Sequence, residues 1–209
     1  MNSKVTHINV GNLAENCWFL ANEDTKEAVV IDPGAEPDRI CAAAEKHGWK
    51  ITAILLTHGH IDHMGACESL RTELGVKVYA LTEEEDLLLD AKKNLSVFIE
   101  RKVVTFEPDE LLRDGQKLTL AGMKIQVIHT PGHTPGGCSY YVAEAGCVFS
   151  GDTLFAESVG RSDFPGGSTS ALVRAVKEKL FLLPDDTLVC PGHGEETTIG
   201  HEKKYNPFV

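Results

Sequence analysis

The segment Thr57–His63 reads THGHIDH and follows a run of apolar residues that predicts a buried strand. It places three imidazoles and one carboxylate within six positions. In an extended chain the side chains at positions i and i+2 face the same way, so His58 and His60 can converge on one metal ion. Asp62 and His63 stand at the turn into the next predicted helix, where they can bind a second ion. This segment predicts a fold in which strands end at a metal-binding edge.

Three further strand ends carry residues of the same kinds. His133 lies in HTPGH, Asp152 follows the predicted strand Cys147–Ser150, and His193 lies in CPGHG. Four strand ends together offer five histidines and two aspartates. Burial of several imidazoles and carboxylates without a cation is costly, and adjacent glycines let the backbone approach closely, so we predict a metal site. His129 could orient a ligand, although core packing is favoured. The expected non-ligands are His7, His47, His129 and His201.

The order of predicted elements indicates an α/β fold with two sheets packed together and helices outside. The predicted strands are Val5–Val10, Cys17–Leu20, Ala28–Ile31, Ile51–Leu56, Val76–Ala80, Lys117–Leu120, Met123–His129, Ser139–Val142, Cys147–Ser150 and Thr187–Cys190. Apolar spacing predicts helices over Pro37–His47, Gly65–Leu74, Ser168–Leu182 and Thr197–Tyr205. Thr82 and Glu85 form a capping-box pattern that predicts another helix, and the acidic run Glu83–Asp86 is interpreted as its solvated first turn.

Composition narrows the class of protein. The 209 residues suit one large domain, and we predict a single domain over residues 1–209. The net charge of −11 argues against a protein that binds nucleic-acid backbones regardless of sequence. No run approaches the roughly 18 apolar residues of a membrane span, and no signal-peptide pattern opens the chain, so a cytoplasmic protein is expected. The six cysteines form no CxxC pair and are expected to be free and mostly buried.

Four motifs together resemble a known family. THGHIDH, TPGHT, GDTLF and PGHG occur in this order and resemble the metallo-β-lactamase superfamily, specifically its glyoxalase II-like hydrolases. The resemblance extends from about Cys17 to Pro207 and implies a four-layer αββα sandwich with metals at one edge of the two sheets. It implies a first ion bound by three histidines, which are His58, His60 and His133. It implies a second ion bound by Asp62, His63 and His193, with Asp152 bridging both ions.

This resemblance implies hydrolysis of an acyl thioester such as S-lactoylglutathione. The expected cofactors are two divalent ions about 3.5–4 Å apart, with Zn²⁺ favoured and iron as the alternative. Such a pair lowers the pKa of a bridging water and polarises the carbonyl group. Asp62 is expected to orient the nucleophile and accept its proton. No GxSxG motif or recognisable cysteine nucleophile is present. Two-domain glyoxalase II enzymes add a C-terminal helical domain that binds glutathione, whereas sixteen residues follow His193 here, an ending that resembles compact single-domain relatives.

The run GRSDF leaves two alternatives for Arg161. Its guanidinium suits a substrate carboxylate, or it pairs with Asp163 and holds the loop. The same run resembles persulfide dioxygenases of this superfamily, which bind a single iron through the equivalents of His58, His133 and Asp152. Neutral imidazole and carboxylate serve iron as well as zinc, so this enzyme is the alternative activity.

Other classes fit the sequence less well. A metal-binding or regulatory protein without turnover is disfavoured because the implied ligand set is complete. Secreted class B β-lactamases are set aside because they use cysteine at the position of Asp152. RNA-processing members add nucleic-acid-binding segments. The expected partner is therefore a small acyl thioester, neither a nucleic acid nor a membrane, and the oligomeric state is left open.

Overall fold

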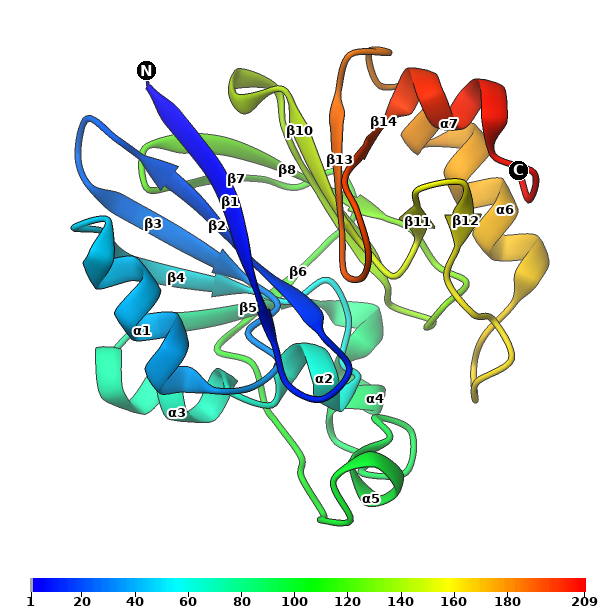
Figure 1. Ribbon diagram of the computed structural model, residues 1–209. Helices are drawn as coiled ribbons and strands as arrows, with labels where there is room; N and C mark the ends of the chain where they lie inside the picture. The colour runs from blue at the N-terminus through cyan, green and yellow to red at the C-terminus, as the bar shows by residue number, and fades with distance from the viewer. Residues whose placement is uncertain (1) are drawn as a thin grey trace.

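Two six-stranded sheets face each other at the centre of the molecule (Figure 1), which the computed structural model describes for residues 2–209. The first sheet has the order β1 (Ser3–Val10), β2 (Glu15–Asn22), β3 (Glu27–Ile31), β4 (Lys50–Leu55), β5 (Lys77–Leu81) and β6 (Glu110–Leu112). The second has the order β14 (Thr197–Thr198), β13 (Leu188–Pro191), β10 (Cys147–Gly151), β9 (Cys138–Val142), β8 (Met123–His129) and β7 (Lys117–Leu120). A small hairpin joins β11 (Leu154–Phe155) and β12 (Ser158–Val159).

Helices cover both outer faces of this pair of sheets. Figure 1 shows α1 (Pro37–Lys46) and α3 (Cys67–Leu74) beside the first sheet, with α6 (Thr169–Glu178) and α7 (Ile199–Tyr205) beside the second. The remaining helices are short, namely α2 (Ile61–Met64), α4 (Glu85–Leu88), α5 (Ser96–Ile99) and the 3₁₀ turns Thr82–Glu84, Ala143–Ala145 and Leu180–Leu182. The expected four-layer αββα sandwich is confirmed.

The core lies in three layers because successive residues of a strand point to opposite faces of the sheet. On β2, Trp18 packs between the two sheets, whereas Phe19 packs toward the helices outside the first sheet. Between the sheets, Trp18 meets Phe149 of the second sheet edge to face, with ring centroids 6.0 Å apart. On β10, Val148 packs with α6 in the outer layer. Each sheet is therefore apolar on both faces.

The direction of the strands decides where the polar loops meet. β3, β4, β5 and β6 run parallel to one another, and β10 runs parallel to β13. Parallel neighbours need crossover connections that return the chain to the same end, so their carboxyl ends share one edge. The segments that follow β3, β4, β10 and β13 consequently lie along one edge of the sandwich.

Two expectations about the predicted helix at Thr82 were wrong. The Thr82 hydroxyl makes no helix cap and instead donates to the carbonyl oxygen of Leu112 on β6 at 2.8 Å. Glu84 is not solvated but buried, with 1% of its surface exposed. Its turn packs against the loops that contain Gly59 and Gly136. Tertiary partners replace the local capping pattern, so only a 3₁₀ turn and the short α4 form here.

Other boundaries also differ from the expectations. The helix expected over residues 65–74 forms as α3 and begins two residues later than expected, after the separate short helix α2. The helix expected over 168–182 ends as α6 before a 3₁₀ turn. Ser168 does cap α6 by accepting from the backbone N–H of Ala171. The two- or three-residue strands β6, β11 and β12 are too short for a periodic signal.

The cysteines agree with the expectation of free and mostly buried thiols. All six cysteines are free, five of them buried and Cys41 half-buried. Among residues 2–209, no helix combines the length and apolar character needed to cross a membrane.

Candidate metal centre

Four loops meet at the edge where the parallel strands end. The loop after β4 carries Thr57–His63, the loop after β8 carries His133, and those after β10 and β13 carry Asp152 and His193. The backbone approaches closely here, since a Cβ on Gly192 would lie only 2.4 Å from Oδ1 of Asp152. The fold therefore brings together the seven side chains that were predicted as ligands.

Three histidines form the first group. Nε2 of His58 lies 3.1 Å from Nδ1 of His60, and Nε2 of His133 lies 2.9 Å from that same Nδ1. Two nitrogens bound at about 2.0–2.1 Å to one tetrahedral ion lie roughly 3.3 Å apart, so the three nitrogens can share one ion. All three side chains are buried.

An aspartate and two histidines form the second group. Oδ2 of Asp62 lies 3.3 Å from Nε2 of His193 and 3.8 Å from Nε2 of His63. Asp62 and His63 open α2, whereas His193 follows β13. Nitrogen and carboxylate donors of this kind suit zinc and other divalent transition metals.

The carboxylate of Asp152 lies between the two groups. Its Oδ2 is 3.5 Å from Nε2 of His133 in the first group and 3.9 Å from Nε2 of His193 in the second. Its Oδ1 is 3.5 Å from Nε2 of His63. A carboxylate in this place can contribute an oxygen to an ion in either group.

Unpaired buried atoms test whether this donor set suits metal ions. Nε2 of His63 and Oδ1 of Asp152 are both buried and lack a hydrogen-bond partner, although they face each other. A buried polar atom without a partner costs about 1–3 kcal/mol. A divalent cation between them would satisfy both atoms, so the residues fit the metal that their chemistry implies.

Hydrogen bonds to the far nitrogen orient three of the imidazoles. Nδ1 of His63 lies 3.0 Å from Oδ2 of Asp32, and Nδ1 of His133 lies 2.6 Å from the carbonyl oxygen of Arg161. Nδ1 of His58 lies 3.2 Å from the hydroxyl of Thr57, which itself donates to Asp32 at 2.5 Å. A proton held on Nδ1 leaves Nε2 free as a ligand, as is usual for metal-bound histidine.

Charge around the groups favours a bound cation. Burial lowers the pKa of His58 well below its usual range and the pKa of His60 to about 3, so both imidazoles are neutral at neutral pH. Burial alone would also lower the pKa of His63, but the carboxylates of Asp152 and Asp62 outweigh it and raise that pKa. The second group therefore lies in a strongly negative environment.

Comparison with known proteins identifies the family. Residues 10–193 match the model of the metallo-beta-lactamase superfamily. The chain belongs to this superfamily. Among its relatives, the probable metallo-hydrolase YqgX of Bacillus subtilis is 39% identical over 96% of this chain and 94% of its own length. The hydroxyacylglutathione hydrolase GloC of Haemophilus influenzae is 37% identical over 93% of this chain and 92% of its own.

Solved structures of the superfamily share the architecture. The BLEG-1 B3 metallo-β-lactamase has a TM-score of 0.93 and 39% identity, covering 98% of this chain and 99% of that one. TTHA1623 in a di-iron-bound form has a TM-score of 0.86 and 38% identity, covering 98% and 100%. ETHE1 from Myxococcus xanthus has a TM-score of 0.78 and 30% identity, covering 99% and 84%.

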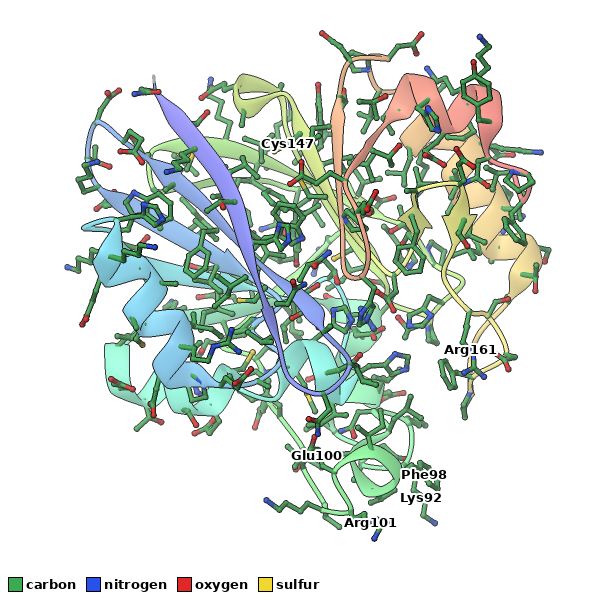
Figure 2. All side chains as sticks on the ribbon, in the orientation of Figure 1. Lys92, Phe98, Glu100, Arg101, Cys147 and Arg161 are labelled. Carbon is green, nitrogen blue, oxygen red and sulfur yellow. The ribbon has the colours of Figure 1, made fainter. Side chains whose placement is uncertain are left out.

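In this superfamily member, the loop after β12 contributes Arg161 in two ways. Its backbone carbonyl holds His133, whereas its guanidinium binds both carboxylate oxygens of Asp163 at 3.0 and 2.9 Å. The guanidinium also lies 4.4 Å from the ring centre of Phe164, and that ring packs edge-on against His60. Figure 2 shows Arg161 at the periphery of the molecule, and its side chain is 67% exposed.

The remaining histidines lie outside both groups. His7 packs against Trp18, and His47 stacks on Trp49. Nε2 of His129 lies 2.8 Å from the carbonyl oxygen of Pro135, and Nε2 of His201 lies 3.0 Å from a carboxylate oxygen of Glu157. None of them belongs to a cluster of metal-binding donors among the described residues.

Sequence reasoning missed three buried acids around the ligands. Asp32 follows β3 and accepts the backbone N–H of Thr57 at 2.7 Å, yet the sequence marks it only as a turn residue in DPG. Neither carboxylate oxygen of Glu15 has a hydrogen-bond partner, and burial raises its pKa well above its usual range. Glu84 accepts backbone N–H groups from two ligand loops. An acid at the edge of an apolar strand is the signal that could have found the first two.

Proposed function

We propose that this protein is a dinuclear metal-dependent hydrolase that cleaves acyl thioesters, with S-lactoylglutathione as the first substrate to test. The observation that carries the proposal is the carboxylate of Asp152 between two groups of three donors. The likeness to the hydroxyacylglutathione hydrolase GloC supports the choice of substrate class. The absence of cysteine pairs supports a cytoplasmic location.

Two divalent ions bound by these groups would lower the pKa of water and polarise the thioester carbonyl. The residues proposed to hold them are His58, His60 and His133 for the first, Asp62, His63 and His193 for the second, and Asp152 for both. Asp62 is proposed to accept a hydrogen bond from the attacking water and so to fix its direction. The departing thiolate has a conjugate-acid pKa of about 8.5, so no dedicated general acid is needed.

Arg161 is proposed to bind a carboxylate of the thiol carrier. Its present partner, Asp163, is 68% exposed, and an exposed ion pair contributes only about 0–1 kcal/mol. A substrate carboxylate can therefore take the place of Asp163 at little cost. The stacking of the guanidinium on Phe164 would keep it near His60 during the exchange.

The mononuclear-iron persulfide dioxygenase is the second candidate. GRSDF resembles that group, and the TTHA1623 structure at 38% identity is a di-iron-bound form, so iron has to be tested beside zinc. The name of the BLEG-1 structure adds β-lactam hydrolysis as a third assay. A protein that binds metal without turnover is the remaining alternative.

One experiment separates these candidates. Protein isolated without oxygen is analysed for metal content and assayed for hydrolysis of S-lactoylglutathione, for oxygen uptake with glutathione persulfide, and for hydrolysis of a β-lactam. Two metals per chain with thiol release support the proposal. One iron with oxygen uptake supports the dioxygenase, and loss of the lactam alone supports a β-lactamase. Inactivity in all three assays with either metal supports a non-catalytic protein.

A further inference from the structure

A buried glutamate joins two of the loops that carry the first group of histidines. Glu84 ends the 3₁₀ turn before α4 and is 1% exposed. Its Oε1 accepts the backbone N–H of Gly59 at 2.8 Å, and its Oε2 accepts the backbone N–H of Gly136 at 2.8 Å. One carboxylate thus uses each oxygen for a different loop.

Both glycines lie in loops that carry predicted ligands of the same metal group. Gly59 lies between His58 and His60, and Gly136 follows three residues after His133. Each hydrogen bond therefore fixes the backbone of a loop within three residues of a predicted ligand. Because the two loops are more than 70 residues apart in the chain, tertiary contacts must set their spacing. The backbone N–H of Cys138 donates to the carbonyl oxygen of Thr57 at 2.8 Å, and Glu84 adds a side-chain link between Gly59 and Gly136.

The packing around Glu84 leaves these loops little room to move. A Cβ on Gly136 would lie 2.2 Å from the backbone nitrogen of Glu84, and one on Gly59 would lie 2.8 Å from Cδ2 of Leu88 on α4. The backbone contact at Gly136 requires glycine there, whereas a Cβ on Gly59 would only displace leucine side chains of α4. The turn and α4 therefore lie directly against both loops. The turn of Glu84 thus contacts both ligand loops, and its carboxylate lies between Gly59 and Gly136.

We propose that Glu84 is a positioning residue that sets the spacing of the first group of ligands and thereby its metal affinity. The inference rests on the two-metal centre of the proposed function. The second group depends on other supports, since Asp62 and His63 belong to α2 and the imidazole of His63 is held by Asp32. In the described part of the chain, Glu84 hydrogen-bonds to neither Asp62 nor His63.

A carboxylate is specifically suited to this place. Both of its oxygens accept hydrogen bonds, so it satisfies two N–H donors that approach from opposite sides. Glutamine has the same size but only one acceptor, and its amide group would face the second N–H donor. The change E84Q therefore breaks one of the two links with minimal change in volume.

Glu202 on α7 provides a matched control. It is fully buried and accepts from the backbone N–H of Glu157 at 2.9 Å and from the side chains of Asn206 and Thr197. Figure 1 places α7 on the outer side of the second sheet, and none of these partners is a predicted ligand. E202Q therefore perturbs a buried carboxylate of the same kind without touching a ligand loop.

The test measures zinc affinity by competition with a chromophoric chelator in two single-site backgrounds. H193A removes a ligand of the second group, and H58A removes a ligand of the first. In the H193A background, E84Q is expected to weaken zinc binding about 10- to 100-fold, as loss of a group that orients ligands does. In the H58A background, E84Q is expected to leave the zinc affinity unchanged. E202Q is expected to change neither affinity.

Equal weakening in both backgrounds would overturn the proposal, as would unchanged affinity in the H193A background or an equal effect of E202Q. If E84Q does not fold, E84D replaces it, since its shorter side chain keeps the charge but cannot span both donors. No substrate enters this assay, so a failure of thioester hydrolysis leaves the result unaffected. Wild-type protein that binds fewer than two zinc ions would instead refute the two-metal centre itself.

Discussion

At the level of single residues, a hydrogen bond at the second ring nitrogen orients three of the five predicted ligand imidazoles. The Nδ1 atoms of His63 and His133 face oxygen acceptors, so Nε2 points into the centre. His60 is the exception, because its Nδ1 faces the other two histidines of its group. Positions i and i+2 place two side chains on the same side of an extended segment. His58 and His60 then reach the same point because His58 uses its Nε2 and His60 uses its Nδ1.

Replacement of Asp152 by alanine tests the link between the two groups. Because its carboxylate lies within 3.9 Å of ligand nitrogens from both groups, D152A is expected to lower both metal content and hydrolysis. The expected loss of rate is at least about 100-fold, since metal and nucleophile are lost together. Metal per chain is measured by elemental analysis beside the rate of thiol release. Full metal content with an undiminished rate would contradict the assignment.

The titration of Glu84 gives a prediction about stability. Burial raises the pKa of this carboxyl from its ordinary value of 4.5 to about 7, despite the hydrogen bonds from Gly59 and Gly136. The folded protein therefore holds a proton that the unfolded chain has lost between these pH values, and folding stability falls as the pH rises through this window. The metal-free wild type should lose stability relative to metal-free E84Q between pH 4.5 and about 7. Denaturant unfolding at several pH values measures the free energy of unfolding of both proteins. A stability of the wild type that rises relative to that of E84Q as the pH increases would contradict the prediction.

At the level of elements, loops carry five of the seven predicted ligands, and the short helix α2 carries Asp62 and His63. The loop after β12 holds His133 through the carbonyl oxygen of Arg161 and exposes the guanidinium of the same residue. Backbone and side chain of one residue thus serve different purposes. The side chain can be changed without removing the hydrogen bond that orients His133.

This separation makes Arg161 and Asp163 a useful pair of variants. R161A is expected to raise KM about 10-fold for thioesters with an anionic carrier, because a hydrogen bond to a charged group contributes about 1.5–3 kcal/mol. A neutral thioester should show little change. D163A should have the opposite effect on KM for the anionic substrate, since it frees the guanidinium from its partner. Equal effects of R161A on both substrates would show that the pair only holds the loop.

At the level of the whole molecule, the two sheets contribute unequally to the centre. The first sheet supplies the THGHIDH loop after β4 and Asp32 after β3, and the second supplies His133, Asp152 and His193. Neither sheet completes either group alone, since His133 joins the first group and His193 joins the second. Bound metal would therefore tie the two sheets together at one edge.

Removal of metal should accordingly lower the melting temperature. An ion present at 100 times its dissociation constant stabilises the folded state by about 2.7 kcal/mol. For a chain of this length, about 1 kcal/mol shifts Tm by roughly 2–4 °C, so a chelator is expected to lower Tm by about 5–10 °C per ion. Differential scanning calorimetry with and without chelator measures the shift, and metal is added back as the control. An unchanged Tm in metal-loaded protein would contradict a structural contribution from the metal.

Much of the fold could be predicted from local pattern. The strands around Ala28–Ile31, Ile51–Leu56 and Met123–His129 have strong runs of β-branched and apolar residues, and the structure places strands there. A short helical segment forms at Thr82 as expected, but the capping role expected of Thr82 was wrong, because its hydroxyl binds β6, which is distant in the sequence. Domain limits and the roles of the individual ligands remain predictions.

The sequence by itself determined which residue types stand at the strand ends, because alternation and turn residues act within a few positions of the chain. It determined that imidazoles and carboxylates would be gathered at one edge. Only the tertiary structure decided that Asp32 orients His63 and that Glu84 spans two ligand loops. Those partners lie 25 to 52 residues apart along the chain, and no local periodicity encodes a hydrogen bond between loops that meet only after both sheets have packed.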